Sequence, residues 1–222
     1  IEVAAYISMF PQLIAGPIVT FDEVQPRLRE RKISPANIEN GLLLFVVGLV
    51  YKVMLANQIA ALWNDVMVAG VMGINTATAW LGAWGYSMQI YFDFLGYSLM
   101  AIGMGYMLGF RFPKNFSNPY CAVSVTDFWR RWHITLGRWF REYVYIPLGG
   151  NKKGKFRLVI NIFIVWFLTG LWHGAAWNFI IWGMFFFILM MLEKFIYLRF
   201  LEKHPIIGHL YMLIIIPVSW VI

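Results

Sequence analysis

The chain has 222 residues, of which 60% are hydrophobic, 18% aromatic and only 13% charged, and its net charge is +7. Because soluble domains average about 25% charged residues, this composition excludes an ordinary soluble domain and a disordered segment, and it predicts a protein embedded in lipid. The single cysteine, Cys121, excludes a disulfide within the chain. The chain begins with Ile1 and stops inside an apolar stretch at Ile222, so we expect it to be a fragment of a longer polytopic protein.

The first sixty residues contain two apolar stretches separated by a polar one. Residues 1–19 are interrupted by prolines and a glycine, which predicts either a broken, re-entrant segment or a plain helix end. Residues 22–40 mix acidic and basic side chains and predict a solvated connection, in which Ser34 and Pro35 can begin a helix. Residues 41–63 are long enough to span a membrane, and Lys52 is expected to snorkel or to form an ion pair.

The next segment is predicted to return through the membrane. Residues 64–78 contain no Lys or Arg, as expected of an extracytoplasmic loop, and residues 78–94 predict a crossing with Asp93 near its end. Asp93 is expected to form an ion pair or end a helix, or else to position a catalytic group. Four glycines between residues 96 and 109 predict a thin surface at which helices pack closely.

Residues 111–157 form a basic region with ten Lys and Arg residues against two acidic ones, Asp127 and Glu142. Such an excess beside spanning helices marks the cytoplasmic side and predicts a cytoplasmic or interfacial region. It is expected to bind anionic lipid, the phosphates of a nucleotide-bearing substrate, or both. Nucleic acid is a poor alternative, because these basic groups lie between membrane segments.

Within this region, the stretch that starts at Phe128 has the pattern of an amphipathic helix. At about 100° per residue, its apolar side chains fall within a third of the circle and its arginines lie opposite. The apolar set comprises Phe128, Trp129, Trp132, Leu136, Trp139, Phe140 and Tyr143. The pattern predicts one helix lying in the membrane interface, capped by residues 124–127 and stopped by Pro147 with Gly149 and Gly150. Only Ile134 is badly placed, and His133 lies at the edge of the apolar face.

Residues 158–192 carry almost no charge and are too many for one spanning helix. The natural break lies between Gly170 and Gly174, so a broken pair of membrane helices is expected to meet around His173. An ionisable group at that depth is a functional candidate by default, although a packing role for His173 and a surface role for His133 are the alternatives. Residues 193–205 predict a polar zone, and residues 206–222 begin another membrane helix.

Several motifs resemble those of a known family. FWRRWHITLGRWFREYVYIPLGG contains His133 and is followed 40 positions later by His173 in LTGLWHGAAWNFIIWG. Together with FPQLIAGPIV at 10–19, YFDFLGYSLMAIGMGYMLGFRFPKNF at 91–116 and NPY at 118–120, they resemble the membrane-bound O-acyltransferases, in particular their bacterial alginate and polysaccharide O-acetyltransferase branch. The resemblance implies an all-α polytopic bundle with in-plane and broken or re-entrant helices around a tunnel, as a single domain over residues 1–222 in the bacterial plasma membrane.

The resemblance also implies a reaction. Cytoplasmic acetyl-CoA, a substrate rather than a tightly bound cofactor, would donate its acetyl group, and an extracytoplasmic partner acetyltransferase would pass it to an exported polysaccharide. Acyl transfer needs a base, and imidazole has a suitable pKa, so His173 is the candidate base and His133 the candidate that holds substrate or stabilises charge. The candidates for substrate binding are Asn178, Trp132, Trp172, Arg130, Arg131, Arg138 and Arg141. No metal site is expected, because no Cys or carboxylate set has ligand spacing.

Three alternatives remain at this point. The donor group could be D-alanine, passed from a carrier protein to teichoic acid by a member of the same family. The chain could instead belong to a proton-coupled transporter with intramembrane histidines, although an in-plane helix of arginines and aromatic residues fits that class poorly. A scaffold of a polysaccharide-export complex would work without either histidine.

Overall fold

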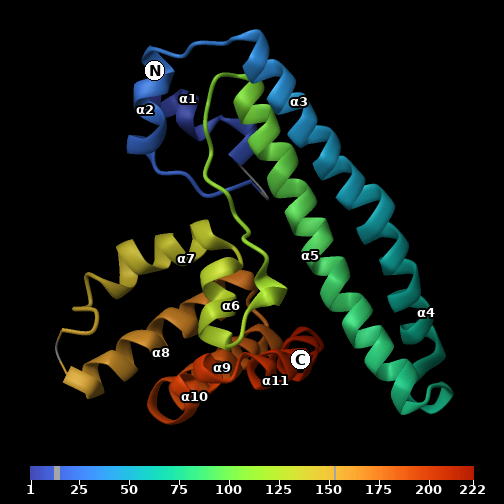
Figure 1. Ribbon diagram of the computed structural model, residues 1–222. Helices are drawn as coiled ribbons and strands as arrows, with labels where there is room; N and C mark the ends of the chain where they lie inside the picture. Colours follow the sequence, from blue (N-terminus) through green and yellow to red (C-terminus); the bar gives the residue numbers. More distant parts are fainter. Residues whose placement is uncertain (13–15, 153) are drawn as a thin grey trace. The chain divides into compact units, whose positions relative to one another are not determined.

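Helices account for every regular element in residues 1–12, 16–152 and 154–222, the part of the chain that a computed structural model describes (Figure 1). No strand occurs in this part, which confirms the predicted all-α class. The described residues divide into two compact units, 1–115 and 116–222. Within the described residues, three helical segments are long and apolar enough to cross a membrane, and they cover Pro35–Gly70, Gly154–His173 and Trp177–Lys203.

The first unit contains two short N-terminal helices, a long broken helix and a second long helix. Its elements are α1 (Glu2–Ile7), η1 (Phe10–Gln12), α2 (Phe21–Arg29), α3 (Pro35–Val50), the π-helical η2 (Tyr51–Ala56), α4 (Asn57–Gly73) and α5 (Thr76–Met107). Residues 1–12 are broken as predicted, whereas Leu13–Ala15 lie outside the described residues. Ser34 caps α3 by accepting a hydrogen bond from the Asn37 amide, and Pro35 occupies its first position, as the sequence indicated.

The predicted loop at residues 64–78 is wrong. Residues 64–73 continue α4, and the chain turns only at Ile74 and Asn75, where Asn75 caps α5. The segment is rich in valine and methionine and lacks proline, so no residue in it excludes a helix. Gly70, at φ +66°, marks a kink instead of an end.

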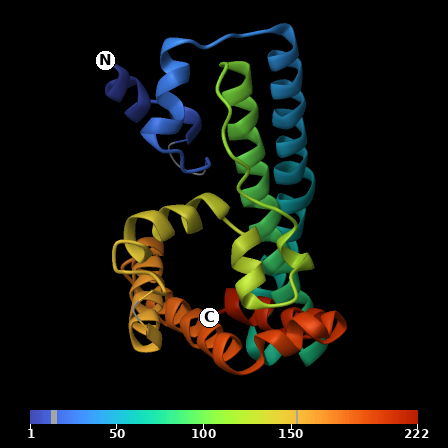
Figure 2. The ribbon, with the colours of Figure 1, turned by 60° about the vertical axis from the view of Figure 1, so that its left-hand side comes forward.

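Close packing between α3 and α5 explains the small residues in both helices. The two helices lie side by side in both views (Figures 1 and 2). A Cβ built on Gly41 would lie 2.6 Å from the Gly103 carbonyl oxygen, and one on Gly48 would lie 2.5 Å from that of Gly96. Only glycine permits this approach of two backbones, so the predicted thin surface at residues 96 and 103 is confirmed.

An ion pair joins η2, the continuation of α3, to α5. Lys52 in η2 donates a hydrogen bond to the Asp93 carboxylate on α5, and its ammonium group also lies 5.1 Å from the centre of the Tyr97 ring. About a third of each charged side chain is exposed. The predicted ion-pair role of both residues is therefore confirmed.

Removing one partner of this pair is expected to destabilise the protein. Lys52→Met leaves the Asp93 carboxylate on α5 without its partner, and we expect the free energy of unfolding in detergent to fall by about 1–2 kcal/mol. The double variant Lys52→Met/Asp93→Leu removes both charges and should recover most of that loss, which a double-mutant cycle measures. Additive losses in the double variant would contradict a direct pair.

The second unit contains the two short helices of the basic region and the apolar helices that follow. Its elements are η3 (Pro119–Cys121), α6 (Val125–Arg131), α7 (Ile134–Phe140), the π-helical η4 (Arg141–Tyr145), α8 (Gly154–His173), α9 (Trp177–Leu192), the π-helical η5 (Glu193–Tyr197), α10 (Leu198–Lys203) and α11 (Pro205–Trp220). The break between α8 and α9 falls at residues 174–176, at the C-terminal end of the predicted range of 170–174 and beyond it, and His173 is the last residue of α8.

An aromatic cluster fills the core of this unit. Trp129 is its centre: its ring lies 4.9 Å from both Trp166 and Phe186 and 5.6 Å from Trp182, measured between ring centroids. Phe128 and Phe186 are fully buried. The cluster joins α6 to α8, α9 and α11, so α6 has its orientation fixed by aromatic residues that follow Trp129 by 37 positions or more.

Glu193 is the one fully buried acidic side chain among the described residues. Its carboxylate accepts hydrogen bonds from the Val125 amide at 2.5 Å, the Thr126 amide at 2.8 Å and the Thr126 hydroxyl at 2.7 Å. These amides are the first of α6 and have no partner inside the helix, so Glu193 satisfies them and complements the positive end of the helix dipole. The start of η5 is thereby tied to the start of α6.

Candidate active site

His133 interrupts the helix that the amphipathic pattern predicted to be continuous. The structure has α6 ending at Arg131 and α7 beginning at Ile134, and His133 between them adopts a left-handed conformation at φ +45° and ψ +51°. A residue with a Cβ rarely adopts this conformation, which adds strain of order 1 kcal/mol. The prediction of one helix from residue 128 to residue 146 is therefore wrong, and the break turns His133 into the unit.

Packing on both sides of the break holds His133 in place. Trp132 is 4% exposed and stacks 5.4 Å from Phe128, with Phe116 and Trp220 about its edges at 5.0 and 5.1 Å. His133 itself is 6% exposed. Trp132, a candidate for substrate binding, thus lies in the aromatic core directly before the histidine.

His173 is the last residue of α8, and its ring has a defined orientation. Its Nδ1 lies 2.8 Å from the Thr169 carbonyl oxygen. A carbonyl oxygen can only accept, so Nδ1 carries the proton and donates it, and the lone pair of the neutral ring is left on Nε2. The ring packs 4.8 Å from Trp182, but the residue is exposed at the turn between α8 and α9. The structure therefore leaves the lone pair on Nε2 of a histidine that is exposed as a residue.

Trp172 brings the two histidines together. Its ring centroid lies 6.0 Å from that of His133 and 4.9 Å from that of His173. Burial, together with the smaller effect of the charge that His173 would carry, lowers the pKa of His133 to about 3. His133 is consequently a neutral group at any physiological pH, able to offer a hydrogen bond but not a positive charge.

The depressed pKa of His133 makes stability depend on pH. The unfolded chain binds a proton at this residue below its ordinary pKa of about 6.5, whereas the folded chain does so only near 3, so the free energy of unfolding falls as the pH is lowered between these values. At pH 5 we expect a loss of about 2 kcal/mol relative to pH 7.5. Thermal unfolding in detergent should show this slope in the native protein and a shallower one in His133→Gln. Equal slopes would contradict a buried neutral histidine.

Some of the remaining candidate side chains are exposed, and others are hydrogen-bonded or half-buried. Asn178, on the first turn of α9, is exposed, as are Arg130 and Arg141. Arg131 donates from Nε to the Asp127 carboxylate at 3.0 Å, which raises the pKa of its guanidinium. Arg138 is half-buried in α7. Among the described residues, no three His, Cys, Asp or Glu side chains gather as a metal ion would require.

Sequence reasoning missed two groups that shape this site. The Thr169 carbonyl, which orients His173, carries no side-chain signal, because any residue four positions before a helix-end histidine offers the same oxygen. Glu193 was placed in a polar zone, whereas the structure buries it against α6. Its position directly after 35 nearly uncharged residues was the available signal, since a lone acid at the end of an apolar helix often has a specific partner.

Comparisons with known proteins place the chain in one family. The model of the membrane-bound O-acyltransferase family, MBOAT, matches residues 1–218. The chain is 43% identical over 194 residues to the probable alginate O-acetylase AlgI of Pseudomonas putida, which covers 87% of this chain and 40% of that protein. It is 42% identical over 197 residues to the peptidoglycan O-acetyltransferase of Helicobacter pylori, and this match covers 87% of this chain and 37% of that protein.

A relative of lower identity is named for the transfer of a different group, D-alanine. The chain is 31% identical over 206 residues to the teichoic acid D-alanyltransferase of Bacillus subtilis, which covers 86% of this chain and 50% of that protein. The chain thus spans between about a third and a half of the length of these curated relatives.

Proposed function

Because the chain belongs to the membrane-bound O-acyltransferase family, we propose that it carries the catalytic histidines of an enzyme that O-acetylates an exported polysaccharide or peptidoglycan. The donor in this proposal is acetyl-CoA from the cytoplasm, and the membrane is the bacterial plasma membrane. The acetyl group would leave on the other side, where a partner acetyltransferase would pass it to the polymer.

The observation that carries the proposal is the grouping of His133, Trp172 and His173. One histidine, His173, is exposed and has its lone pair on Nε2, and the other, His133, is buried and neutral. A base beside a neutral hydrogen-bond donor is the pair that acyl transfer to a hydroxyl requires.

The proposed step follows from these positions. Nε2 of His173 takes the proton of the acceptor hydroxyl as its oxygen attacks the thioester carbonyl, and the carbonyl oxygen becomes an oxyanion. His133 donates a hydrogen bond to that oxyanion. The carbon–sulfur bond then breaks, and the imidazolium of His173 returns the proton to the departing thiolate, so the histidine ends the cycle neutral. The Thr169 carbonyl stabilises the imidazolium while it exists, because it accepts from Nδ1.

Exposed arginines on the same unit support a phosphate-bearing donor. Arg130 and Arg141 are exposed, whereas Arg131 is paired with Asp127 and Arg157 donates to the Leu148 carbonyl at 3.1 Å. We propose that Arg130 and Arg141 contact the phosphates of CoA, for which guanidinium groups are suited. Asn178 and Trp172 are proposed to contact the acyl group and its acceptor at the turn between α8 and α9.

A second candidate is transfer of D-alanine, which the similarity to the Bacillus subtilis enzyme favours. The same pair of histidines would serve it, since the step is again acyl transfer from a thioester to a hydroxyl. The lower identity of 31%, against 43% for the alginate relative, makes acetyl transfer the better-supported reaction.

The test is a donor comparison in a reconstituted membrane. The protein in nanodiscs, with its extracytoplasmic partner and a polysaccharide acceptor, is given radiolabelled acetyl-CoA or a D-alanyl carrier protein, and label on the polymer is measured. We expect label from acetyl-CoA only. Label from the carrier protein alone would support the second candidate, and solute flux without any acyl donor would favour a transporter.

A further inference from the structure

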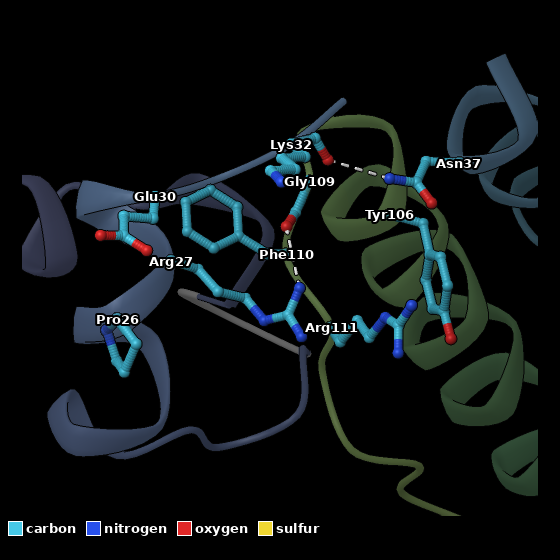
Figure 3. Close-up of a pocket in the computed structure, with 9 residues that line it drawn as sticks. All are labelled: Pro26, Arg27, Glu30, Lys32, Asn37, Tyr106, Gly109, Phe110 and Arg111. Carbon is cyan, nitrogen blue, oxygen red and sulfur yellow. Dashed lines mark hydrogen bonds between the residues drawn. The ribbon is translucent and has the colours of Figure 1, made fainter. Parts of the chain in front are cut away.

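A second site, separate from the histidines, lies within the first unit. A pocket of about 390 Å³ is lined by α2, the link between α2 and α3, the first turn of α3, and the end of α5 with the residues that follow it. Its lining residues are Pro26, Arg27, Glu30, Lys32, Asn37, Tyr106, Gly109, Phe110 and Arg111 (Figure 3). The volume falls at the lower end of the range of about 300–1,000 Å³ that small-molecule sites occupy.

The end of α5 builds one wall of this pocket. Gly109 has φ +81°, and the Phe110 amide donates back to the Gly105 carbonyl at 2.8 Å, which closes the helix and turns the chain. A Cβ at residue 109 would lie 3.2 Å from the Lys32 carbonyl oxygen, so glycine also lets the α2–α3 link approach. This turn delivers Arg111 to the pocket opposite α2.

The charge of the lining is strongly positive. Arg27, Lys32 and Arg111 contribute three cations against the single carboxylate of Glu30. Arg27 donates to the Gly109 carbonyl at a long 3.4 Å, and Figure 3 shows its guanidinium directed toward the backbone that leads to Arg111. Just outside, the Arg31 guanidinium lies 5.6 Å from the centre of the Phe110 ring. Cations gathered around one concavity repel each other, so a bound anion would be stabilised there.

The position of the pocket along α3 defines the source of that anion. α3 begins at Pro35 as the first residue of a segment that can span the membrane, and Asn37 on its first turn lines the pocket. The pocket therefore lies at the depth of the lipid headgroups, at the Lys- and Arg-rich end of the helix, which is the cytoplasmic end by the positive-inside rule. Anionic headgroups are concentrated in that layer.

We propose that this pocket binds the phosphate of an anionic phospholipid headgroup. Arg27 and Arg111 hold the phosphate oxygens from α2 and from the segment after α5, and Lys32 supplies the third charge. Tyr106 and Phe110 provide the apolar wall against which the glycerol portion packs. Such a lipid would join α2 to the ends of α3 and α5. The proposal stands apart from the acyl-transfer reaction and holds whichever acyl group the protein transfers.

The chain offers two matched pairs of variants for the test. In the first pair, Arg111 lines the pocket, whereas the exposed Lys114 three residues later does not. In the second pair, Arg27 lines the pocket, whereas Arg29 on the same helix does not and forms an ion pair with Glu2 at 2.6 Å. Each member of a pair loses one positive charge when changed to glutamine. The pairs therefore separate binding in the pocket from general attraction to a basic surface.

The measurement is native mass spectrometry of the purified protein in detergent, titrated with phosphatidylglycerol and, separately, with phosphatidylcholine. We expect the native protein to retain a tightly bound phosphatidylglycerol. Arg27→Gln and Arg111→Gln should each lower the affinity for this lipid about fivefold, because one cation near an anionic surface contributes about that much to binding. Arg29→Gln and Lys114→Gln should leave the affinity unchanged, and Glu30→Gln should increase it.

Three results would overturn the proposal. Equal losses within each matched pair would mean that only overall charge matters. Equal affinity for phosphatidylcholine would exclude recognition of an anionic lipid. Displacement of the lipid by millimolar inorganic phosphate or glycerol 3-phosphate, sensitive to Arg27 and Arg111, would assign the pocket to a water-soluble phosphate compound instead.

Discussion

Replacing His173 with glutamine is expected to lower the rate of acyl transfer by about 10² to 10⁴-fold, the contribution of a positioned general base. Glutamine is similar in size and can still donate to the Thr169 carbonyl, but its amide cannot accept a proton at neutral pH. The donor should therefore still bind, and the loss should appear in kcat and not in KM. Single-turnover measurements with radiolabelled acetyl-CoA separate the two.

His209 provides the matched control for this variant. It lies on α11 in the same unit, is exposed, and has no contact with His133, Trp172 or His173 among the interactions of the described residues. His209→Gln should keep the native rate. Unchanged turnover in His173→Gln, with donor binding retained, would refute the assignment of His173 as the base.

Gly170→Ala is expected to destabilise the second unit by about 2–3 kcal/mol and to slow the reaction. A Cβ at residue 170 would lie 2.5 Å from the Phe179 carbonyl oxygen, which is backbone of α9 and cannot rotate away. To accept the added Cβ, α8 and α9 must move apart until this distance exceeds 3.0 Å. Because His173 lies one turn further along α8 and packs on Trp182 of α9, this movement also displaces its ring.

Gly137→Ala adds the same methyl group, but we expect it to increase the stability of the protein. The nearest atom to its added Cβ is the Trp129 carbonyl oxygen at 4.0 Å, and residue 137 is exposed within α7. Alanine is favoured over glycine in a helix by about 1 kcal/mol, so this variant should be slightly more stable than the native protein. Unfolding midpoints in detergent and rates compare the two; a shift in the same direction for both would contradict the packing argument at Gly170.

The helical class and the main breaks of the fold were accessible from the sequence. The lack of charge in residues 158–192 and the glycines at 170 and 174 predicted two helices with His173 at their junction, and the structure has α8 ending at His173. Ser34, Asn75 and Ser124 precede helices and cap them through their side chains. These features depend on local chemistry, which sequence patterns describe directly.

The break at His133 was not predicted, because its cause lies outside the local sequence. Residues 128–143 fit an amphipathic helix, and only tertiary packing of Trp132 against Phe116 and Trp220 makes a left-handed residue acceptable after it. One signal was present: Ile134, the residue that the helical pattern placed badly, is the first residue of α7. A change in helical phase at that position indicates a break.

The contacts of the candidate site also depend on tertiary packing, which the local sequence does not reveal. The sequence named His133 and His173 as candidates without placing them near each other, and their shared contact with Trp172 is a finding of the structure. The role of Trp132 in substrate binding stays a prediction, and its burial in the aromatic core is a property that composition does not reveal. Hydrogen bonds between residues 67 and 68 positions apart, such as those of Glu193, have no local signature at all.

The carboxylate of Glu193 also sets an order of events during synthesis. Thr126 leaves the ribosome 67 residues before its partner, which at about 5–20 residues per second is an interval of roughly 3–13 s. During this time the first amides of α6 lack the acceptor that they have in the finished protein. The segment that carries His133 therefore acquires its final position only after α8 and α9 have been made, and a chain that stops before residue 193 contains both histidines without the geometry that relates them.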